Sequence, residues 1–241
     1  MGHALITGAG IRIGRAIAEA FAQRGDTVIL HANRSVASAE VLAEEIQNKG
    51  GKAHVVQADL NSSEGVAHLA EQTQAHTPVL DTLVNNAAIY ESVPFERIEQ
   101  EQFLKMLQIN LMAPFFLTQK LLPLFAQSKD PSVVNIIDTS VHRPEKGYSH
   151  YSTTKAGLLS MTKSLAVELG ARLRVNGVAP GAIAFPQRFS QEAQDKVLAR
   201  VPLGRVGSPE DIAKAAVFLA KDGPYISGEM IHVDGGWNAN G

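Results

Sequence analysis

The chain has 241 residues, of which 45% are hydrophobic and 19% are charged, a composition typical of a globular protein. The net charge of −2 argues against a nucleic acid partner, and the absence of cysteine excludes a disulfide, a thiolate metal site and a cysteine nucleophile. No apolar stretch reaches the roughly 18 residues of a membrane-spanning helix, and the first residues lack the basic and apolar regions of a signal peptide. We therefore expect a cytoplasmic protein with no membrane segment, and we predict no metal site.

Short apolar runs alternate with helical patterns along the whole chain. The predicted strands are residues 4–7, 27–31, 53–57, 82–84, 132–137, 174–178 and 230–233. The predicted helices are one that ends near residue 24, then 37–49, 63–76, 99–125 with a kink at Pro114, 151–169 and 209–220. Strict alternation favours a parallel sheet with helices on both faces, and continuously apolar strands fit a sheet that is covered on both sides.

These elements predict a single α/β domain over residues 1–241, built on a doubly wound parallel sheet. The least regular stretch is 183–203, which contains Pro186 and Pro202. We expect it to form a substrate loop with a short helix over the cleft, and Phe185 and Pro186 to line the substrate site.

A glycine-rich turn lies between the first predicted strand and the first predicted helix. It reads Thr-Gly-Ala-Gly-Ile-Arg-Ile-Gly over residues 7–14. In this place a dinucleotide-binding fold holds a pyrophosphate against backbone N–H groups and the positive end of the helix. A tight turn that needs glycine for its conformation alone is the weaker alternative. We predict a cofactor site that includes Gly8, Arg12, Ile13 and Gly14.

The segment after the second strand decides between NAD and NADP. A carboxylate there would bind the ribose 2′-hydroxyl and repel a 2′-phosphate. Instead the chain has Asn33, Arg34 and Ser35, with no acidic residue before Glu40. A guanidinium flanked by hydrogen-bonding side chains suits a phosphate, which favours NADP(H), although Arg34 can also be read as a solvated surface arginine.

Two more residues follow the third strand. Asp59 and Leu60 lie where the adenine end of a dinucleotide would be, and we predict that they contact it. A local role for Asp59 in capping the turn is an equally good interpretation.

The sequence Tyr151-Ser-Thr-Thr-Lys155 falls at the start of a predicted helix. Residues four apart lie on one face of a helix, so the ammonium of Lys155 is expected to lower the pKa of the Tyr151 phenol. Such a pair transfers protons in carbonyl or imine chemistry. Asp138 lies thirteen residues before Tyr151 and supplies a carboxyl group to this pair. Asp138 can also be interpreted as a cap at the end of its strand, in which case Thr139 or Ser140 would act with the tyrosine instead.

Taken together, these motifs resemble the short-chain dehydrogenase/reductases over nearly the full length of the chain. The resemblance rests on the glycine-rich turn, Tyr151 with Lys155, and four further features: Asn85-Asn86-Ala87, Asn110, Pro180-Gly181 and the closing Val-Asp-Gly-Gly of residues 233–236. It implies a Rossmann fold, a nicotinamide cofactor contacted by Asn86, Ala87, Tyr151, Lys155, Pro180 and Gly181, and a homotetramer. It also implies that Asn110 supports a water chain to Lys155.

Two departures from the family pattern narrow the resemblance to pteridine reductase and dihydromonapterin reductase. Arg12 stands where the family usually has glycine, and Asp138 stands where it usually has the catalytic serine. Tyr90 lies where pteridine reductases carry an aromatic residue that stacks on the pterin. A carboxylic acid suits the reduction of a pterin C=N bond, because a ring nitrogen must receive a proton.

The resulting hypothesis is an NADPH-dependent pteridine reductase that takes a dihydropterin to the tetrahydropterin, with an oxidised pterin or folate as further possible substrates. Asp138, Tyr151, Lys155 and Asn110 are the predicted catalytic residues. Arg12 and Tyr90 are predicted to bind the substrate together with Asp138 and Tyr151. Two alternatives stay open: an NADPH-dependent carbonyl or 3-oxoacyl reductase, and a non-catalytic NADP-binding regulator.

Overall fold

The structure is a computed structural model that describes residues 2–184 and 190–240. Seven strands form one sheet, in which every neighbouring pair is parallel and the order is β3-β2-β1-β4-β5-β6-β7. The strands are β1 (His3–Ile6), β2 (Thr27–Ala32), β3 (Lys52–Gln57), β4 (Thr82–Asn85), β5 (Ser132–Ile136), β6 (Arg174–Pro180) and β7 (Met230–Val233). The predicted single-domain, doubly wound Rossmann fold is confirmed.

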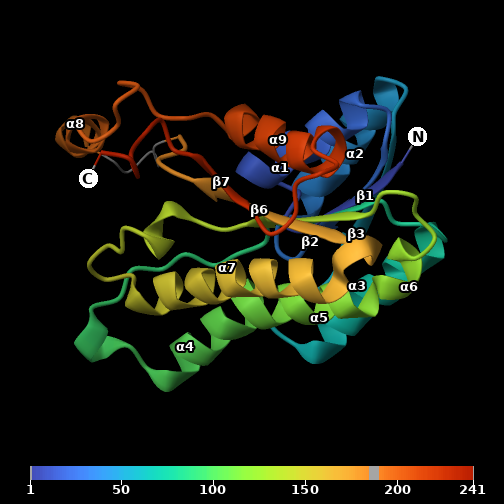
Figure 1. Cartoon of the computed structure of the whole chain (residues 1–241), viewed down its shortest axis with the longest axis horizontal. Coiled ribbons are helices and arrows are strands. Elements are labelled where there is room, and N and C mark those ends of the chain that lie inside the picture. Colours follow the sequence, from blue (N-terminus) through green and yellow to red (C-terminus); the bar gives the residue numbers. More distant parts are fainter. Residues whose placement is uncertain (1, 185–189, 241) are drawn as a thin grey trace.

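Helices cover both faces of this sheet (Figure 1). The α-helices are α1 (Arg12–Gln23), α2 (Val36–Asn48), α3 (Ser63–His76), α4 (Gln100–Leu107), α5 (Ala113–Lys120), α6 (Leu122–Phe125), α7 (Ser149–Leu169), α8 (Gln191–Leu198) and α9 (Pro209–Val217). Short 3-10 turns are η1 (Phe95–Arg97), η3 (Thr139–Val141) and η4 (Gly170–Arg172), and two π-helical turns are η2 (Gln108–Met112) and η5 (Phe218–Asp222).

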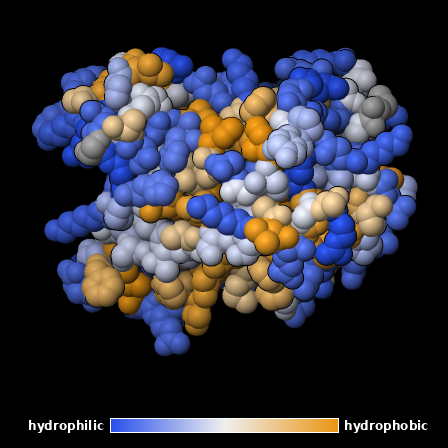
Figure 2. All heavy atoms as spheres, viewed as in Figure 1, coloured by the Kyte–Doolittle hydropathy of each residue, from blue (hydrophilic) through white to orange (hydrophobic). Residues whose placement is uncertain are grey.

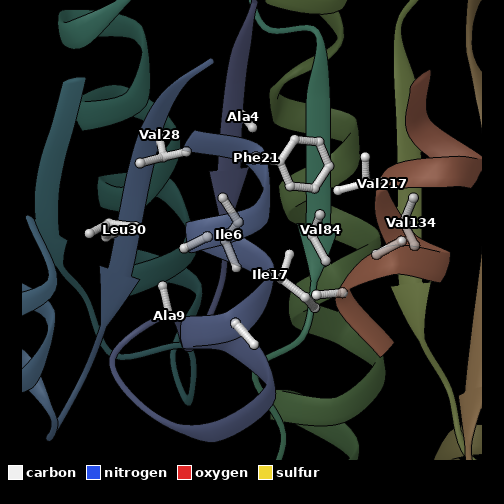
Figure 3. Close-up of a cluster of buried hydrophobic side chains, with 14 of the residues drawn as sticks. Ala4, Ile6, Ala9, Ile17, Phe21, Val28, Leu30, Val84, Val134 and Val217 are labelled. Carbon is white, nitrogen blue, oxygen red and sulfur yellow. The ribbon is translucent and has the colours of Figure 1, made fainter. Parts of the chain in front are cut away.

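The core consists of two large apolar layers, one on each side of the sheet. Ala4 and Ile6 of β1 point into the layer under α1, α2 and α9, whereas Leu5 between them points into the layer under α3, α5 and α7. Figure 3 shows the first layer, in which Ile17 and Phe21 of α1 pack against strand residues. Because side chains alternate along a strand, both faces of each central strand are apolar, as predicted.

Two long predicted helices are interrupted in the structure. The helix predicted at 99–125 divides into α4, η2, α5 and α6, and its break is a π-helical turn that ends just before Pro114. The helix predicted at 209–220 ends at Val217 and continues into η5. The other predicted strands and helices occur with ends that differ by at most two residues, and the short helix predicted within 183–203 is α8. Among the described residues, the structure contains no helix long and apolar enough to cross a membrane.

Candidate active site

The carboxyl ends of β1, β4, β5 and β6 carry most of the predicted site residues. In a doubly wound sheet, ligands bind outside these ends where the strand order reverses, and here that point lies between β1 and β4, since the chain passes from β1 outward to β2 and then returns to the other side. The candidate site therefore lies at this crevice.

The glycine-rich turn fits a close approach of a ligand to its backbone. Gly8 has φ of +66°, a left-handed conformation that glycine adopts without strain. A Cβ atom on Gly14 would lie 2.1 Å from the carbonyl oxygen of Gly8, so only glycine fits there. Arg12 also has a positive φ, of 51°. This explains why glycine is usual at that position in the resembled family, and it means that the arginine is kept despite backbone strain.

Thr7 and Asn86 hold this turn against the end of β4. The Thr7 hydroxyl oxygen accepts hydrogen bonds from the backbone N–H groups of Asn86 and Ala87, at 2.9 and 3.0 Å. The Asn86 amide donates to the carbonyl oxygens of Thr7 and Gly8, at 2.8 and 3.1 Å. Asn86 is predicted to contact the cofactor, and in the structure its side-chain nitrogen also fixes the turn. Sequence reasoning missed Thr7, although it begins the motif.

The residues predicted to read the adenine end lie on neighbouring loops after β2 and β3. Asn33 donates from its side chain to Asp59 at 2.9 Å, and the same carboxylate oxygen accepts the backbone N–H of Asn61 at 3.0 Å. Asp59 therefore does cap its own turn. Arg34 is exposed, which leaves its guanidinium accessible to a phosphate.

Two other predicted cofactor residues are placed by close packing. Ser35 packs against Gly10, where an added Cβ would come within 2.7 Å of the Ser35 hydroxyl oxygen. Leu60 is buried, and its backbone oxygen accepts a hydrogen bond from Gln108 at 3.4 Å.

Asp138 joins the end of β5 to Tyr151 on α7. One carboxylate oxygen caps η3 by accepting the N–H of Ser140 at 2.7 Å, and the other accepts the Tyr151 hydroxyl at 3.0 Å. The cap that the sequence offered as one interpretation is present, and the other carboxylate oxygen lies within hydrogen-bond distance of Tyr151. A carboxyl group and a phenol share one proton-transfer contact in the crevice.

The expected effect on the Tyr151 phenol is reversed in this structure. Burial and the nearby Asp138 carboxylate raise the pKa of Tyr151 well above its ordinary value. Lys155 lies to one side, with its ammonium 5.8 Å from the centre of the tyrosine ring. The prediction that Lys155 lowers this pKa is therefore wrong here, and Tyr151 is a protonated phenol that can donate.

Lys155 is buried and points to the end of β5. Its ammonium donates to the carbonyl oxygen of Ile136 at 2.7 Å. Burial lowers the pKa of Lys155 to about 8, against the opposing attraction of Asp138. This lysine can therefore change its charge near neutral pH.

Asn110 lies in the π-helical turn η2, a type of distortion that occurs often at functional sites. Its amide donates to the carbonyl oxygen of Ile89 at 3.0 Å and to the Thr154 hydroxyl at 3.3 Å, and its oxygen accepts the N–H of Ile89 at 2.9 Å. Asn110 thus connects the segment after β4 to Thr154 of α7, the residue directly before Lys155. The sequence did not predict the π-helical turn.

Three tyrosines form an aromatic wall beside Asp138. The rings of Tyr90 and Tyr148 are stacked with centroids 4.4 Å apart and 9° between their planes, and Tyr90 meets Tyr151 edge to face at 4.8 Å. Tyr90 was predicted at the substrate site and is half exposed there. Tyr148, which directly precedes α7, was missed.

Glu145 is a second carboxyl group near these tyrosines, and it was not predicted as a site residue from the sequence. Burial and the neighbouring Asp138 raise its pKa, while Arg200 opposes the change. The carboxyl groups of Asp138 and Glu145 therefore influence each other electrostatically in a partly buried environment.

The far side of the crevice is formed by the end of β6 and by the loop after it. Pro180 ends β6, and the N–H of Gly181 donates to Val233 at 3.1 Å. Arg12 reaches this side and donates to the carbonyl oxygen of Ile183 at 3.4 Å. The predicted contacts of Phe185 and Pro186 lie outside the described residues. Among those that are described, no cluster of three or more histidine or acidic side chains is arranged to hold a metal ion.

Comparison with known proteins adds to this geometry. Residues 8–238 match the sequence model of a family described as enoyl-(acyl carrier protein) reductase. The chain is 41% identical to the 3-oxoacyl-[acyl-carrier-protein] reductase FabG of Aquifex aeolicus, over 96% of this chain and 95% of that protein.

Two solved structures are similar over almost the whole chain. FolM alternative dihydrofolate reductase 1 from Brucella canis, complexed with NADP, has a TM-score of 0.92 and 31% identity, covering 99% of this chain and 94% of that one. The angucycline C-6 ketoreductase LanV with bound NADP also has a TM-score of 0.92 and 31% identity, covering 99% and 96%.

Proposed function

The chain belongs to the short-chain dehydrogenase/reductase family, and on that premise we propose that it is an NADPH-dependent reductase of a pterin C=N bond. The observation that carries the substrate class is the hydrogen bond from the Tyr151 hydroxyl to Asp138, where the resembled family usually has serine. The similarity to a dihydrofolate reductase of the same fold also supports it.

NADP(H) is the cofactor, and the residues present fit it. The similar solved structures carry NADP. In this chain the segment after β2 offers Arg34 and no carboxylate before Glu40, and Gly8 and Gly14 leave room for a pyrophosphate against the backbone. When bound, NADPH supplies the hydride.

The protein's own residues then supply and hold the proton. Tyr151 is protonated because burial and Asp138 raise its pKa, so it can donate to a substrate atom that gains electrons. The carboxylate of Asp138 accepts from the Tyr151 hydroxyl and so orients the phenol. To donate to the substrate itself, Asp138 would first have to take up a proton from solvent. Tyr90, supported by Tyr148, offers an aromatic face to a flat heterocycle, and Arg12 offers a cation to its polar edge.

The second candidate is an NADPH-dependent 3-oxoacyl or other carbonyl reductase. The curated relatives favour it, since those at 34–41% identity are 3-oxoacyl-[acyl-carrier-protein] reductases. Their similarity over nearly the full chain supports an NADPH-dependent reduction, a reaction that both candidates share. Tyr151 alone can protonate a carbonyl oxygen, so this chemistry is compatible with the same site. The two candidates differ in what they require of Asp138.

Asp138→Ser separates the two candidates. We expect this variant to lose dihydropterin reduction by about 100-fold or more, the usual contribution of a general acid, while it keeps its affinity for NADPH. Thr139→Ser, at the next position, is the matched control and should keep its activity. If Asp138→Ser reduced dihydropterin as fast as the unchanged enzyme, the assignment of the carboxyl group would be wrong. A gain in acetoacetyl-thioester turnover would instead support the second candidate.

The same resemblance leads us to propose a homotetramer. Several large apolar side chains on α4, η2 and α5 are exposed: Leu104, Met112, Phe115 and Phe116. Figure 2 shows apolar residues along the part of the surface where α4 and α5 lie. An exposed apolar surface of this kind is typical of a contact between protein chains.

A further inference from the structure

We propose that His31 is a positioning residue for the dinucleotide: its neutral imidazole links the glycine-rich turn to the loop after β3 and so sets the distance between the pyrophosphate and adenine ends of the site. The proposal rests on the NADP(H) site proposed above. It concerns a residue that the proton-transfer chemistry does not use.

Both ring nitrogens of His31 are engaged, each with a different loop. The backbone N–H of Gly8 donates to Nδ1 at 3.2 Å, and Nε2 lies 3.1 Å from the carbonyl oxygen of Ala58. These contacts fix the tautomer. An N–H donor requires Nδ1 to be an acceptor, so the single proton is on Nε2 and is donated to Ala58.

The position of His31 in the sheet explains how it makes this link. It lies near the carboxyl end of β2, between β1 and β3, and only 2% of its surface is exposed. Its own carbonyl oxygen accepts the N–H of Ala9 at 2.8 Å. The side chain and backbone of this residue therefore hold two successive residues of the turn, Gly8 and Ala9.

The other end of the link lies beside the predicted adenine contacts. Ala58 immediately precedes Asp59, whose carboxylate accepts from Asn33. His31 thus joins the turn that would hold the pyrophosphate to the loop pair that would hold the adenosine. A dinucleotide would span both, whereas an adenosine 2′-phosphate without the pyrophosphate would contact only the loop pair.

The charge state of His31 is consistent with this role. Burial lowers the pKa of His31 to about 4, against weaker opposing effects of the hydrogen bond to Ala58 and of the charge on Asp59. Asp59 is the charged group that acts on it from the loop after β3, whereas the contacts from the β1 turn are backbone groups. The imidazole is therefore neutral at physiological pH, as the contact with Gly8 requires.

The test compares a whole cofactor with half of one. Affinities for NADPH and for adenosine 2′-monophosphate, which lacks the pyrophosphate, are measured for the unchanged protein, His31→Leu and His31→Gln. We expect His31→Leu to weaken NADPH binding roughly tenfold, the effect of leaving a buried N–H and C=O without partners, and to change the binding of the half-cofactor less than about twofold. His31→Gln retains one acceptor and one donor and should recover most of the loss.

Equal weakening of both ligands, or unchanged NADPH affinity in folded His31→Leu, would overturn the proposal. If His31→Leu does not fold, the ¹⁵N shifts of the imidazole in the unchanged protein decide. A proton on Nδ1 at neutral pH would contradict the link to Gly8, whereas a proton on Nε2 together with a change of the His31 signals on addition of NADPH supports it. Failure of the unchanged protein to bind NADPH would contradict the proposed function instead.

Discussion

The burial of Lys155 should make the free energy of unfolding depend on pH. The side chain is almost fully buried, and its ammonium donates a hydrogen bond to the carbonyl oxygen of Ile136. The unfolded chain has the ordinary lysine pKa of 10.5, and the folded protein has about 8. Between these two values the unfolded chain binds more protons, so stability rises with pH through this window.

The size of the effect follows from the same two values. At 1.36 kcal/mol for each tenfold change in proton affinity, the charged lysine lowers the free energy of unfolding by about 3 kcal/mol near pH 7, and the penalty disappears above pH 10.5. Lys155→Met removes it. We expect the stability advantage of Lys155→Met over the unchanged protein to fall by about 2 kcal/mol between pH 7 and 9.5.

Urea denaturation of the cofactor-free protein at fixed concentration measures this difference. Lys163→Met is the matched control, because Lys163 is exposed on the same helix and its loss should have no effect that varies over this pH range. If the difference between Lys155→Met and the unchanged protein stayed constant from pH 7 to 9.5, the lysine would not be held with a lowered pKa. Such a result would also remove the reason to regard it as a group that titrates during turnover.

Two further predictions concern the turn and the apolar helix surface. Arg12→Gly should raise the free energy of unfolding by about 1 kcal/mol, because φ of 51° is strained for arginine but not for glycine. The same change should weaken the binding of NADPH or of the pterin. A thermal-shift assay that finds the variant less stable than the unchanged protein would contradict this reasoning. Phe116→Glu should lower the molar mass measured by analytical ultracentrifugation, because Phe116 is one of the exposed apolar residues of α5. The control Val41→Glu, at an exposed residue of α2, should leave the molar mass unchanged. An unchanged mass for Phe116→Glu would place the contact between chains elsewhere.

The order of strands and helices could be predicted because the central strands are apolar on both faces and turn residues such as Gly25 and Gly50 separate several helices from the next strand. The convergence of Asp138, Tyr151 and Lys155 could also be predicted. The spacing of Tyr151 and Lys155 fixes their common helix face, and the end of a neighbouring strand brings Asp138 to them. These features depend on local sequence and on the topology of a parallel sheet.

Other features depend on tertiary packing and had no local signal. The π-helical turn that places Asn110 reads as ordinary helix in the sequence. The pKa of Tyr151 is raised because of its burial and the position of the Asp138 carboxylate. The spacing between Tyr151 and Lys155 determines neither of these. The link made by His31 joins residues 23 and 27 positions away from it, and only the three-dimensional structure brings them together.

The most direct test of the central claim is the oxidation of NADPH by the purified protein with dihydrobiopterin, run beside acetoacetyl-thioester. The proposed pairing of Asp138 with Tyr151 as a donor to a ring nitrogen predicts turnover of the pterin, with little or none of the thioester. Turnover of the thioester alone would contradict the pterin assignment and establish a 3-oxoacyl reductase on the same fold and cofactor.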